Sequence, residues 1–269
     1  MATASLVVTE AAETLIPDSE AKAVAAFGDG VDVVVVGGGT IVLPEITYGR
    51  LRPRKTLLLK DAGLSGIKRD GSRVTIGATT PIEDLVELLA PLGPCAANIA
   101  DLEIRGVATV GGNLCAGEGG GAPRGDLQGA FLALGATVRS AGEGGVEEEP
   151  LEDFLERREN RLALDVSYEE PDAGAFAGLD RPHTHDYTAL AVSAARSGDG
   201  TVRLGVSGVA GHAVRLSTAE RNADDPPAAG VAALSDVTFA DDALASAWYR
   251  EKVLPVLVRR VLTELKGAA

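Results

Sequence analysis

The stretch Thr109-Val110-Gly111-Gly112-Asn113-Leu114 is read together with an earlier stretch of the same design, Val35-Val36-Gly37-Gly38-Gly39-Thr40. In both, a β-branched run that is typical of a strand gives way to adjacent glycines and then to a small polar residue. Glycine tolerates backbone angles that other residues resist, and it leaves no side chain in the way. The N–H groups of such a turn can converge on a phosphate. Two such loops predict a ligand with more than one phosphate, which we interpret as the pyrophosphate of a dinucleotide cofactor.

Two other phosphate-binding motifs can be compared with the first glycine loop. A P-loop needs a Gly-Lys-Ser/Thr ending, and the first lysine after the loop is Lys55. A Rossmann fingerprint needs a third glycine where Val42 stands, and Pro44 follows soon after. Asp61 does follow the next expected strand, roughly at the place of a ribose-binding acid. A nicotinamide site therefore stays open as a rival interpretation, beside a plain strand-to-loop connection.

Composition limits the classes of function. The chain has 269 residues, of which 45% are hydrophobic, enough for one large domain or two modest ones with a real core. The formal charge of -14 argues against general nucleic-acid binding and against adhesion to anionic membranes. No apolar run approaches the length of a membrane span, and the N-terminus lacks a basic-then-apolar signal. The expected location is the cytoplasm.

Residues that commonly bind metals or act as nucleophiles are sparse. Cys95 and Cys115 are the only cysteines, and they form no C-x-x-C pair, so no cysteine-rich metal site or iron–sulfur cluster is expected within the chain. His183 and His185 have a spacing seen in metal sites, but no third ligand is evident, and no metal is expected. Neither a Ser-His-Asp order nor a G-x-S-x-G elbow is present. The chemistry is therefore expected to come from a cofactor, and no catalytic acid or base is assigned.

Hydrophobic periodicity predicts the elements around the two loops. Strands are expected at residues 32–36, 56–59, 73–77, 135–139 and 162–167, and helices at residues 21–27 and 79–89. Residues 117–125 are too rich in glycine for a regular element and are expected to form a loop.

The second half of the chain changes in character. Strands at residues 187–195 and 201–209 are expected to form a hairpin, with helices at residues 241–266 that carry an apolar face. Residues 169–182 and 221–230 are expected to be loops. A C-terminal unit of sheet plus helices should therefore start between residues 165 and 185.

Two charged residues near the loops have more than one interpretation. Arg105 could brace the second glycine loop or the cofactor phosphates, although a lone arginine is more often a structural brace. Asp126 ends the loop at residues 117–125. It could cap the helix expected at residues 127–134, or it could form hydrogen bonds with cofactor hydroxyls.

Residues 103–114 resemble the Q-I-R-N-x-A-T-I-G-G-N-L signature of the FAD-binding medium subunits of molybdenum hydroxylases, the xanthine dehydrogenase and carbon monoxide dehydrogenase type of enzyme. Weaker similarities keep the family's order along nearly the whole chain. They lie at residues 38–44 (A-G-G-T-D-L-L-P in the family), 76–80 (I-G-A-x-T-T), 126–136 (D…L-L-A-L-G-A) and 245–262 (A-S-x-x-Y-R…R-R-A-L).

The resemblance implies an α+β fold of the vanillyl-alcohol-oxidase/PCMH-like type. A two-subdomain FAD-binding domain would occupy residues 1–165, with subdomains at about 1–60 and 61–165, and a small C-terminal sheet-plus-helices domain would follow at 166–269. FAD would lie between these parts with its pyrophosphate on the two glycine loops, and Phe176 would lie near the flavin ring. With Arg105 added, the predicted cofactor-binding residues are Val35, Val36, Gly37, Gly38, Gly39, Thr40, Ile41, Val42, Arg105, Thr109, Val110, Gly111, Gly112, Asn113, Asp126 and Phe176.

Three positions depart from the family's pattern. Ile41 replaces the usual acid after the G-G-T triplet. The segment between Asn113 and Asp126 is longer and far richer in glycine, and Gly178 stands where a lysine commonly follows the aromatic residue. These departures concern the surroundings of the flavin ring, and hence the electron acceptor, more than FAD binding itself.

The function that the resemblance implies is an FAD-carrying electron-transfer subunit. Its partners would be a molybdopterin-binding large subunit and a [2Fe-2S] small subunit in a hetero-oligomer, with NAD, a quinone or another molecule as the acceptor. A flavin suits this role because it exchanges either one or two electrons. Two alternatives remain: a stand-alone FAD-dependent oxidoreductase on the same fold, and a non-catalytic nucleotide-binding scaffold.

Overall fold

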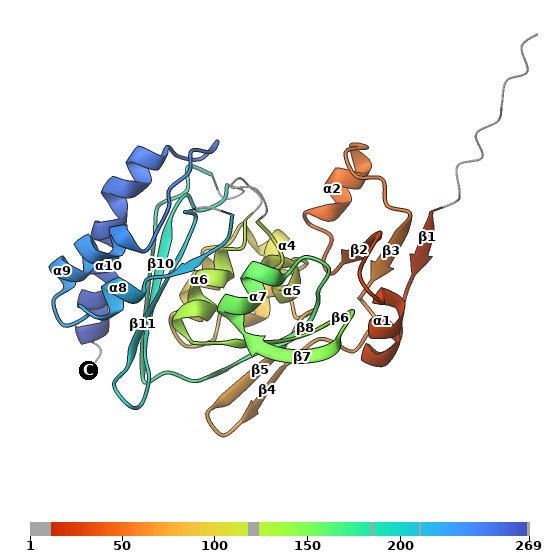
Figure 1. Cartoon of the computed structure of the whole chain (residues 1–269), viewed down its shortest axis with the longest axis horizontal. Helices are drawn as coiled ribbons and strands as arrows, with labels where there is room; N and C mark the ends of the chain where they lie inside the picture. The colour runs from red at the N-terminus through yellow and green to blue at the C-terminus, as the bar shows by residue number, and fades with distance from the viewer. Residues whose placement is uncertain (1–11, 118–123, 184–185, 210, 268–269) are drawn as a thin grey trace, which may run out of the picture.

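The computed structural model describes residues 12–117, 124–183, 186–209 and 211–267. Three sheets lie in a row along the molecule, and each has helices of its own (Figure 1). The first is parallel and the other two are antiparallel, with most helices packed against them rather than alternating with strands. This is the α+β class that the sequence predicts.

The N-terminal unit is a three-stranded parallel sheet in the order β1-β3-β2, at the right of Figure 1. Helix α1 (Glu20–Phe27) begins where the Ser19 hydroxyl accepts a hydrogen bond from the backbone of Lys22, and it ends at Gly28 with φ +63°. Strand β2 leads directly into the first glycine loop, and α2 follows this loop. The bounds are β1 Glu13–Leu15, β2 Val33–Val36, β3 Lys55–Leu58 and α2 Val42–Thr47.

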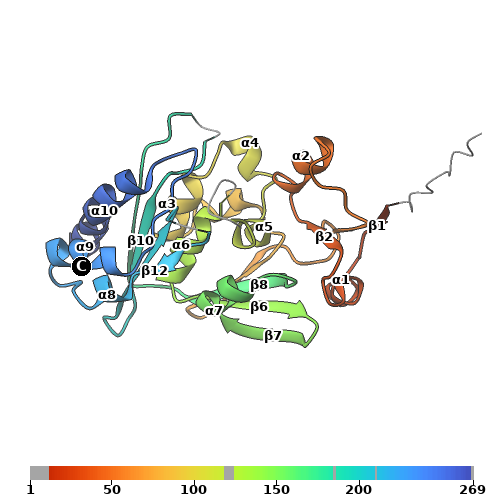
Figure 2. The same ribbon diagram turned by 45° about the horizontal axis from the view of Figure 1, so that its top comes forward.

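The middle unit is a five-stranded antiparallel sheet in the order β4-β5-β8-β6-β7. Its helices include α5, whose first turn contains Gly111 and Gly112 of the second glycine loop, and α6, which lies between this sheet and the C-terminal one (Figure 2). The strands are β4 Ile67–Asp70, β5 Arg73–Gly77, β6 Thr137–Gly142, β7 Gly145–Pro150 and β8 Leu162–Glu169. The helices are η1 Ile82–Leu85, α3 Leu92–Ala97, α4 Leu102–Arg105, α5 Val110–Leu114, α6 Asp126–Ala133 and α7 Leu151–Arg157.

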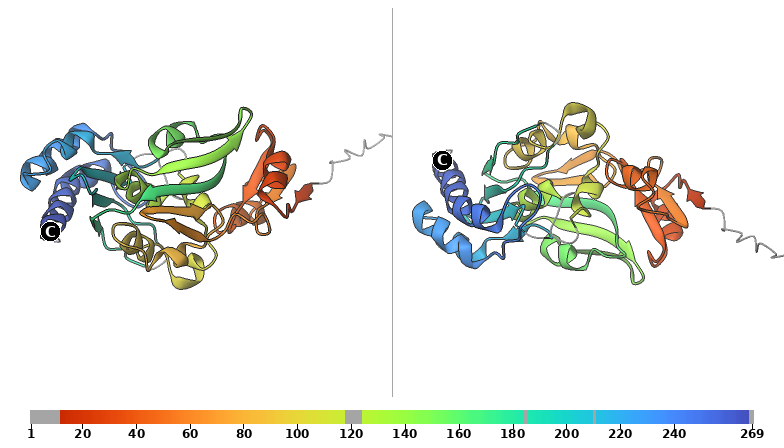
Figure 3. Two further views of the ribbon diagram at one scale, coloured as in Figure 1. Left: turned by 90° about the horizontal axis from the view of Figure 1, so that it is seen from below. Right: turned by 90° about the horizontal axis from the view of Figure 1, so that it is seen from above.

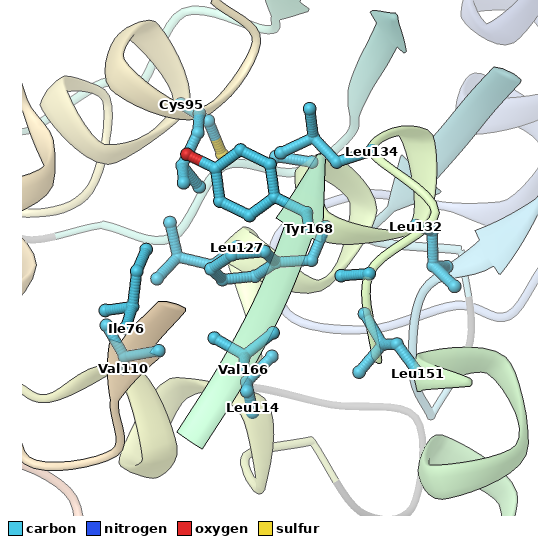
Figure 4. Packing of buried hydrophobic residues seen from close by; sticks show 14 of the residues in the cluster. Ile76, Cys95, Val110, Leu114, Leu127, Leu132, Leu134, Leu151, Val166 and Tyr168 are labelled. Carbon is cyan, nitrogen blue, oxygen red and sulfur yellow. The ribbon is translucent and has the colours of Figure 1, made fainter. Parts of the chain in front are cut away.

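Helix α6 forms the centre of the largest hydrophobic core. All eight of its residues are buried. Leu127 packs in one cluster with Val110 and Leu114 of α5 and with Ile76 and Val166 of the sheet (Figure 4). The start of α5 is therefore held against both the sheet and α6, which fixes the position of the second glycine loop.

The C-terminal unit is a four-stranded antiparallel sheet in the order β12-β11-β10-β9, with α6 on one face and α10 on the other (Figure 3). The predicted hairpin is confirmed, because β10 and β11 pair around residues 197–201. The predicted apolar face of the last helix is confirmed too, since Leu254, Leu257, Val258, Val261, Leu262 and Leu265 are all buried. The bounds are β9 Ala173–Gly178, β10 Ala191–Arg196, β11 Val202–Ser207, β12 Val214–Arg215, α8 Ser217–Glu220, α9 Pro226–Ala232, η2 Ala233–Ser235 and α10 Ala247–Gly267.

Three expectations for secondary structure are wrong. The helix predicted at residues 79–89 is only the short η1, and a tight turn follows in which a Cβ on Gly93 would lie 2.1 Å from the Leu88 oxygen. The loop predicted at residues 169–182 contains β9, a strand of small residues whose backbone pairs with β10. The loop predicted at residues 221–230 contains the start of α9, which Asp225 caps through its side chain.

The predicted domain boundary after residue 165 falls inside β8, which continues to Glu169 in the middle sheet. We propose that the C-terminal unit begins after β8, in the segment 170–172 that leads to β9. No helix in the described part of the chain is both long and apolar enough to cross a membrane.

Candidate functional site

The two glycine loops meet at a cavity of about 430 Å³. A Cβ on Gly38 would lie 1.9 Å from the Val107 oxygen, and a Cβ on Gly37 would lie 2.4 Å from Thr109 Oγ1. Only glycine permits this contact, because any side chain at either position would overlap the other loop. The N-terminal unit therefore contacts the middle unit through these two loops, directly beside the cavity.

The first glycine loop has free hydrogen-bond donors. The backbone N–H groups of Gly37, Gly38, Gly39 and Thr40 donate to none of the residues that the structure describes. All four residues line the cavity. Since unpaired N–H groups need an acceptor, this loop is suited to an anionic group such as a phosphate.

The second glycine loop differs from the first, because its N–H groups are already used. Those of residues 110 and 111 bind carbonyl oxygens in the segment after β5, at 3.0 and 2.8 Å. Those of residues 112 and 113 bind the side-chain and backbone oxygens of Thr109, at 3.2 and 2.9 Å. The second loop can therefore offer a ligand the hydroxyl hydrogen of Thr109 and the side-chain amide of Asn113, whose Oδ1 accepts from the Leu127 backbone at 2.9 Å.

Asp126 is the first residue of α6, and it lines the cavity with a buried carboxyl group. It does not cap the helix, since the N-cap is Gly125 and no side-chain capping bond is formed. Its Oδ1 atom is buried without a hydrogen-bond partner among the described residues. Burial raises the pKa of Asp126 to about 7, and the charges of Arg124 and Arg181 offset this in part. An unsatisfied buried carboxyl beside a cavity indicates a ligand-binding role.

A network of buried charges connects this part of the cavity to α10. Arg124 lines the cavity and donates to Asp242, and Asp242 also accepts from Arg250 at 2.7 Å. Arg250 is buried and donates to three carbonyl oxygens as well. Burial alone would raise the pKa of Asp242, but hydrogen bonds from Arg250 and from two backbone N–H groups lower it to about 2. Arg124 is therefore held in place by the C-terminal unit.

Two other arginines near the cavity act as braces. Arg161 lines the cavity but pairs with Glu147 at 2.8 Å and donates to Ser140. Arg105 does not line the cavity: it pairs with Glu83 at 2.6 Å and donates to carbonyl oxygens of residues 97, 99 and 100. Arg105 thus fastens α4 to the turn after α3, which is the structural one of its two interpretations.

The structure brings most of the predicted site residues together. Twelve of the sixteen line the cavity, namely Val35, Gly37, Gly38, Gly39, Thr40, Ile41, Val42, Thr109, Gly111, Gly112, Asn113 and Asp126. Val36 and Val110 are instead buried in the hydrophobic core, and Phe176 packs against the central core from β9.

Sequence reasoning missed several residues of the cavity. Tyr187, Asp186, Cys115, Arg124 and Arg161 line it, as do the apolar residues Leu59, Ala78, Ile82, Ile99, Ala100, Ile104, Ala108, Ala116, Leu162 and Ala163. The aromatic side chain that borders the cavity is Tyr187 rather than Phe176. No local pattern marks these positions, because folding alone brings them together. Only the glycine-rich stretch before Arg124 indicates in the sequence that a ligand could lie near this residue. Residues 118–123 of that stretch lie outside the described part of the chain.

Metal ligands are not gathered in the part of the chain that the structure describes, where no group of three or more His, Cys, Asp or Glu side chains could hold an ion. His183 is exposed, and its partner in the proposed pair, His185, lies outside the described residues.

Comparison with known proteins identifies the family. Residues 10–167 match the family described as the FAD binding domain in molybdopterin dehydrogenase. The chain belongs to this family. Its cofactor is FAD, as predicted. The chain is an oxidoreductase subunit.

The similarity extends over the full length of the FAD-binding chain. The carbon monoxide dehydrogenase medium chain of Afipia carboxidovorans is 28% identical, over 94% of this chain and 96% of its own. A carbon monoxide dehydrogenase structure from Hydrogenophaga pseudoflava, which lacks the Mo-pyranopterin moiety of its cofactor, superposes with a TM-score of 0.84 at 25% identity, over 96% and 98% of the two chains. Quinoline 2-oxidoreductase from Pseudomonas putida 86 has the same fold, with a TM-score of 0.80 at 20% identity and coverage of 96% and 98%.

The residues of the cavity fit FAD on structural grounds. The free N–H groups of the first loop suit a diphosphate, and the apolar side chains along the cavity suit aromatic rings. The unsatisfied carboxyl of Asp126 suits a donor such as a hydroxyl group. Asp61, the acid of the rival nicotinamide site, does not line the cavity and pairs with Lys60 at 3.7 Å. The structure therefore does not support a nicotinamide site around Asp61.

Proposed function

We propose that this chain is the FAD-carrying medium subunit of a hetero-oligomeric molybdenum hydroxylase of the carbon monoxide dehydrogenase type. Its partners would be a large subunit that binds molybdopterin and a small subunit that holds [2Fe-2S] clusters. The observation that carries this proposal is the full-length similarity to a carbon monoxide dehydrogenase medium chain. The sequence has only two cysteines, Cys95 and Cys115, so an electron-donating cluster would have to be held by another chain.

The roles of the chain's own residues follow from the cavity. Residues 37–40 would hold the diphosphate with their backbone N–H groups, and Thr109 and Asn113 would add side-chain donors. Asp126 and Tyr187 would contact the remainder of the cofactor. FAD, when bound, exchanges one or two electrons, which suits a link between a [2Fe-2S] chain and an acceptor such as NAD or a quinone. The apolar walls would keep water away from the cofactor.

The same proposal places the complex in the cytoplasm. Cys95 is a buried free thiol. Secreted and periplasmic proteins more often contain disulfides, so a free thiol agrees with a reducing compartment.

Co-purification tests the subunit proposal. The chain, carrying an affinity tag, is expressed with and without candidate large and small subunits of the proposed complex. We expect all three chains to co-purify with FAD, iron and molybdenum, and we expect the substrate of the large subunit to bleach the flavin only in the complex. A chain that binds FAD, purifies alone and oxidises a small molecule by itself would instead be the stand-alone oxidoreductase. A colourless chain that takes up no added FAD would be the scaffold.

A further inference from the structure

The buried carboxyl group of Asp126 lacks the hydrogen bonds to described residues that the carboxyl group of Asp242 has. Asp126 is 5% exposed, its Oδ1 has no hydrogen-bond partner, and it forms no ion pair with any described residue. Asp242, by contrast, accepts hydrogen bonds from both Arg124 and Arg250. A buried carboxylate without partners is costly, so the unsatisfied state of Asp126 needs a physical explanation.

The groups around Asp126 explain its state in the cofactor-free chain. Arg124 precedes it by two residues, and Arg181 and Tyr187 approach from the segment before β10. From α3, the Cys95 thiol donates to the Asp126 backbone oxygen at 3.4 Å. Burial raises the pKa of Asp126 to about 7, with Arg124 and Arg181 acting in the opposite direction. Near neutral pH, the carboxyl group is therefore partly protonated.

Other elements packed on α6 place no further charge beside Asp126. Near its N-terminus, α5 and β11 contribute the uncharged Asn113 and Ser207. Charged residues on the strands and on α7 have other partners. Arg196 donates to the Leu265 oxygen, Arg215 pairs with Glu220 and Glu152, and Glu156 pairs with His212. Arg203 lies beside Gly135, at the other end of α6.

Asp126 lies beyond the phosphate-binding part of the cavity. Thr109, at the start of α5, contacts the first glycine loop, and Asn113, near the end of α5, holds the residue after Asp126. The five residues of α5 span about 7 Å at 1.5 Å per residue. A cofactor with its diphosphate on the first loop would therefore present a part beyond the diphosphate to Asp126. The polar hydrogens of FAD outside the diphosphate belong to hydroxyl, imide and amino groups.

We propose that binding of FAD is coupled to ionisation of Asp126: a hydroxyl, imide or amino group of the cofactor donates a hydrogen bond to the carboxylate, and the carboxyl proton leaves to solvent. The proposal rests on the FAD binding assigned above and deepens it. A hydrogen bond from a donor favours the charged form of a carboxylate, and it is stronger when the acceptor is ionised. No covalent bond changes, and at most one proton is released for each FAD bound.

The expected result is an FAD affinity that depends on pH in one direction. Below the pKa of about 7, binding must displace the proton, so the dissociation constant should fall by up to about tenfold for each pH unit of increase. Above about pH 7.5, where the carboxyl group is already ionised, the dissociation constant should level off.

The test uses the full chain, freed of cofactor with concentrated bromide, and FAD as the probe. Quenching of FAD fluorescence gives the dissociation constant between pH 5.5 and 8.5. Calorimetry at pH 6.5 in two buffers with different ionisation enthalpies counts the protons released by the unmodified chain. This count needs no variant, so it decides the question even if an Asp126 variant folds poorly.

Two variants assign the proton to a residue. Asp126→Asn should bind FAD with an affinity that no longer changes with pH and should release no proton. Asp61→Asn is the matched control, because Asp61 is an exposed carboxylate outside the cavity, and it should keep the slope of the unmodified chain.

The outcomes separate this proposal from the cofactor assignment. FAD binding that is independent of pH, or that weakens as pH rises, would overturn the proton coupling alone. A slope that persists in Asp126→Asn would overturn it too. A chain that binds no FAD at any pH would overturn both the cofactor assignment and this proposal.

Discussion

At the scale of single residues, the glycines of the two loops have different tasks. Gly37 and Gly38 let the loops touch, since a side chain on either would overlap the neighbouring loop. Gly112 lines the cavity, and a Cβ there would meet only Thr109 Oγ1, at 3.0 Å. The first two glycines are therefore needed for the fold around the site, and we propose that Gly112 is needed mainly to leave room for the ligand.

Gly112→Val tests this distinction. A branched side chain would project into the cavity, and we expect FAD affinity to fall at least about tenfold, which corresponds to about 1.4 kcal/mol, while the fold survives. Visible absorption measures the flavin retained after purification, and circular dichroism reports the fold. Gly144→Val is the control, because a Cβ at this position meets nothing within 4 Å and lies outside the cavity. Full flavin occupancy in Gly112→Val would contradict the assigned role.

Asp126 should lower the stability of the cofactor-free chain. The pKa of Asp126 is about 7 in the folded chain, against an ordinary value of 3.8. The neutral carboxyl group therefore makes its full contribution to the free energy of unfolding below pH 3.8. This contribution is lost as the pH rises towards about 7. Asp126→Asn avoids this loss, so it should be more stable than the unmodified chain at pH 8, by up to about 4 kcal/mol at 1.36 kcal/mol per pH unit. Urea unfolding without FAD at pH 5 and pH 8 checks this, and a stability difference that is equal at both pH values would argue against it.

At the scale of elements, α6 lies unusually close to β11. A Cβ on Gly205 of β11 would lie 2.1 Å from the Gly129 oxygen of α6, and a Cβ on Gly129 would lie 2.6 Å from Ser207 Oγ. Two facing glycines therefore bring helix and sheet into backbone contact. This contact places Asp126, at the start of α6, beside the segment of Tyr187 in the cavity wall.

Gly205→Ala should weaken this contact. The added methyl group meets backbone rather than a flexible side chain, so we expect a loss of about 1–3 kcal/mol in the free energy of unfolding. Gly198→Ala, in the turn of the same hairpin, is the matched control, since its Cβ would have only ordinary contacts at 3.7 and 3.8 Å with Asp172. Urea denaturation of both variants measures the effect, and equal stabilities would show that α6 can shift without cost.

Local patterns predict well the elements whose ends carry their own signals. Helix α1 starts at Ser19 and ends at Gly28, and the hairpin β10–β11 turns at a Ser-Gly-Asp-Gly run. Strand β9 has no such signal, because Ala173, Ala175 and Ala177 have low strand propensity and become buried only where the sheet packs against α10. The helix predicted at residues 79–89 fails for a related reason: Leu85 is buried while Leu89 is 58% exposed, so the apolar spacing does not correspond to one buried face.

At the scale of the whole molecule, the cavity is walled by all three units, through residues such as Val35, Asp126 and Tyr187. A cofactor in it would touch residues of all three units at once. Ligand binding to the folded state alone stabilises it by about 2.7 kcal/mol when the free ligand is at 100 times its dissociation constant.

We therefore expect FAD to stabilise the chain by about this amount, and to protect amides in more than one unit. Hydrogen exchange of the chain with and without saturating FAD should slow at residues 37–40 and at the start of α6 together. Gly112→Val, treated with the same FAD concentration, should show a smaller stabilisation. Protection confined to one unit would mean that the cofactor does not bridge them.

The sequence by itself determined the family and the cofactor, and it marked many of the residues that line the cavity. It could do so because a glycine loop is a local device: its backbone freedom and its exposed N–H groups follow from consecutive residues. The sequence also marked Asp126 but left open whether it caps a helix or contacts a ligand.

Only the tertiary structure decided between such alternatives. It showed that the N–H groups of the second loop donate to Thr109 and to the segment after β5, whereas those of the first loop donate to none of the described residues. It placed Tyr187 rather than Phe176 at the cavity, and it left the Oδ1 atom of Asp126 buried without a hydrogen-bond partner among the described residues. These properties depend on which groups meet across long sequence distances, and burial and pairing of that kind have no local signature in a sequence.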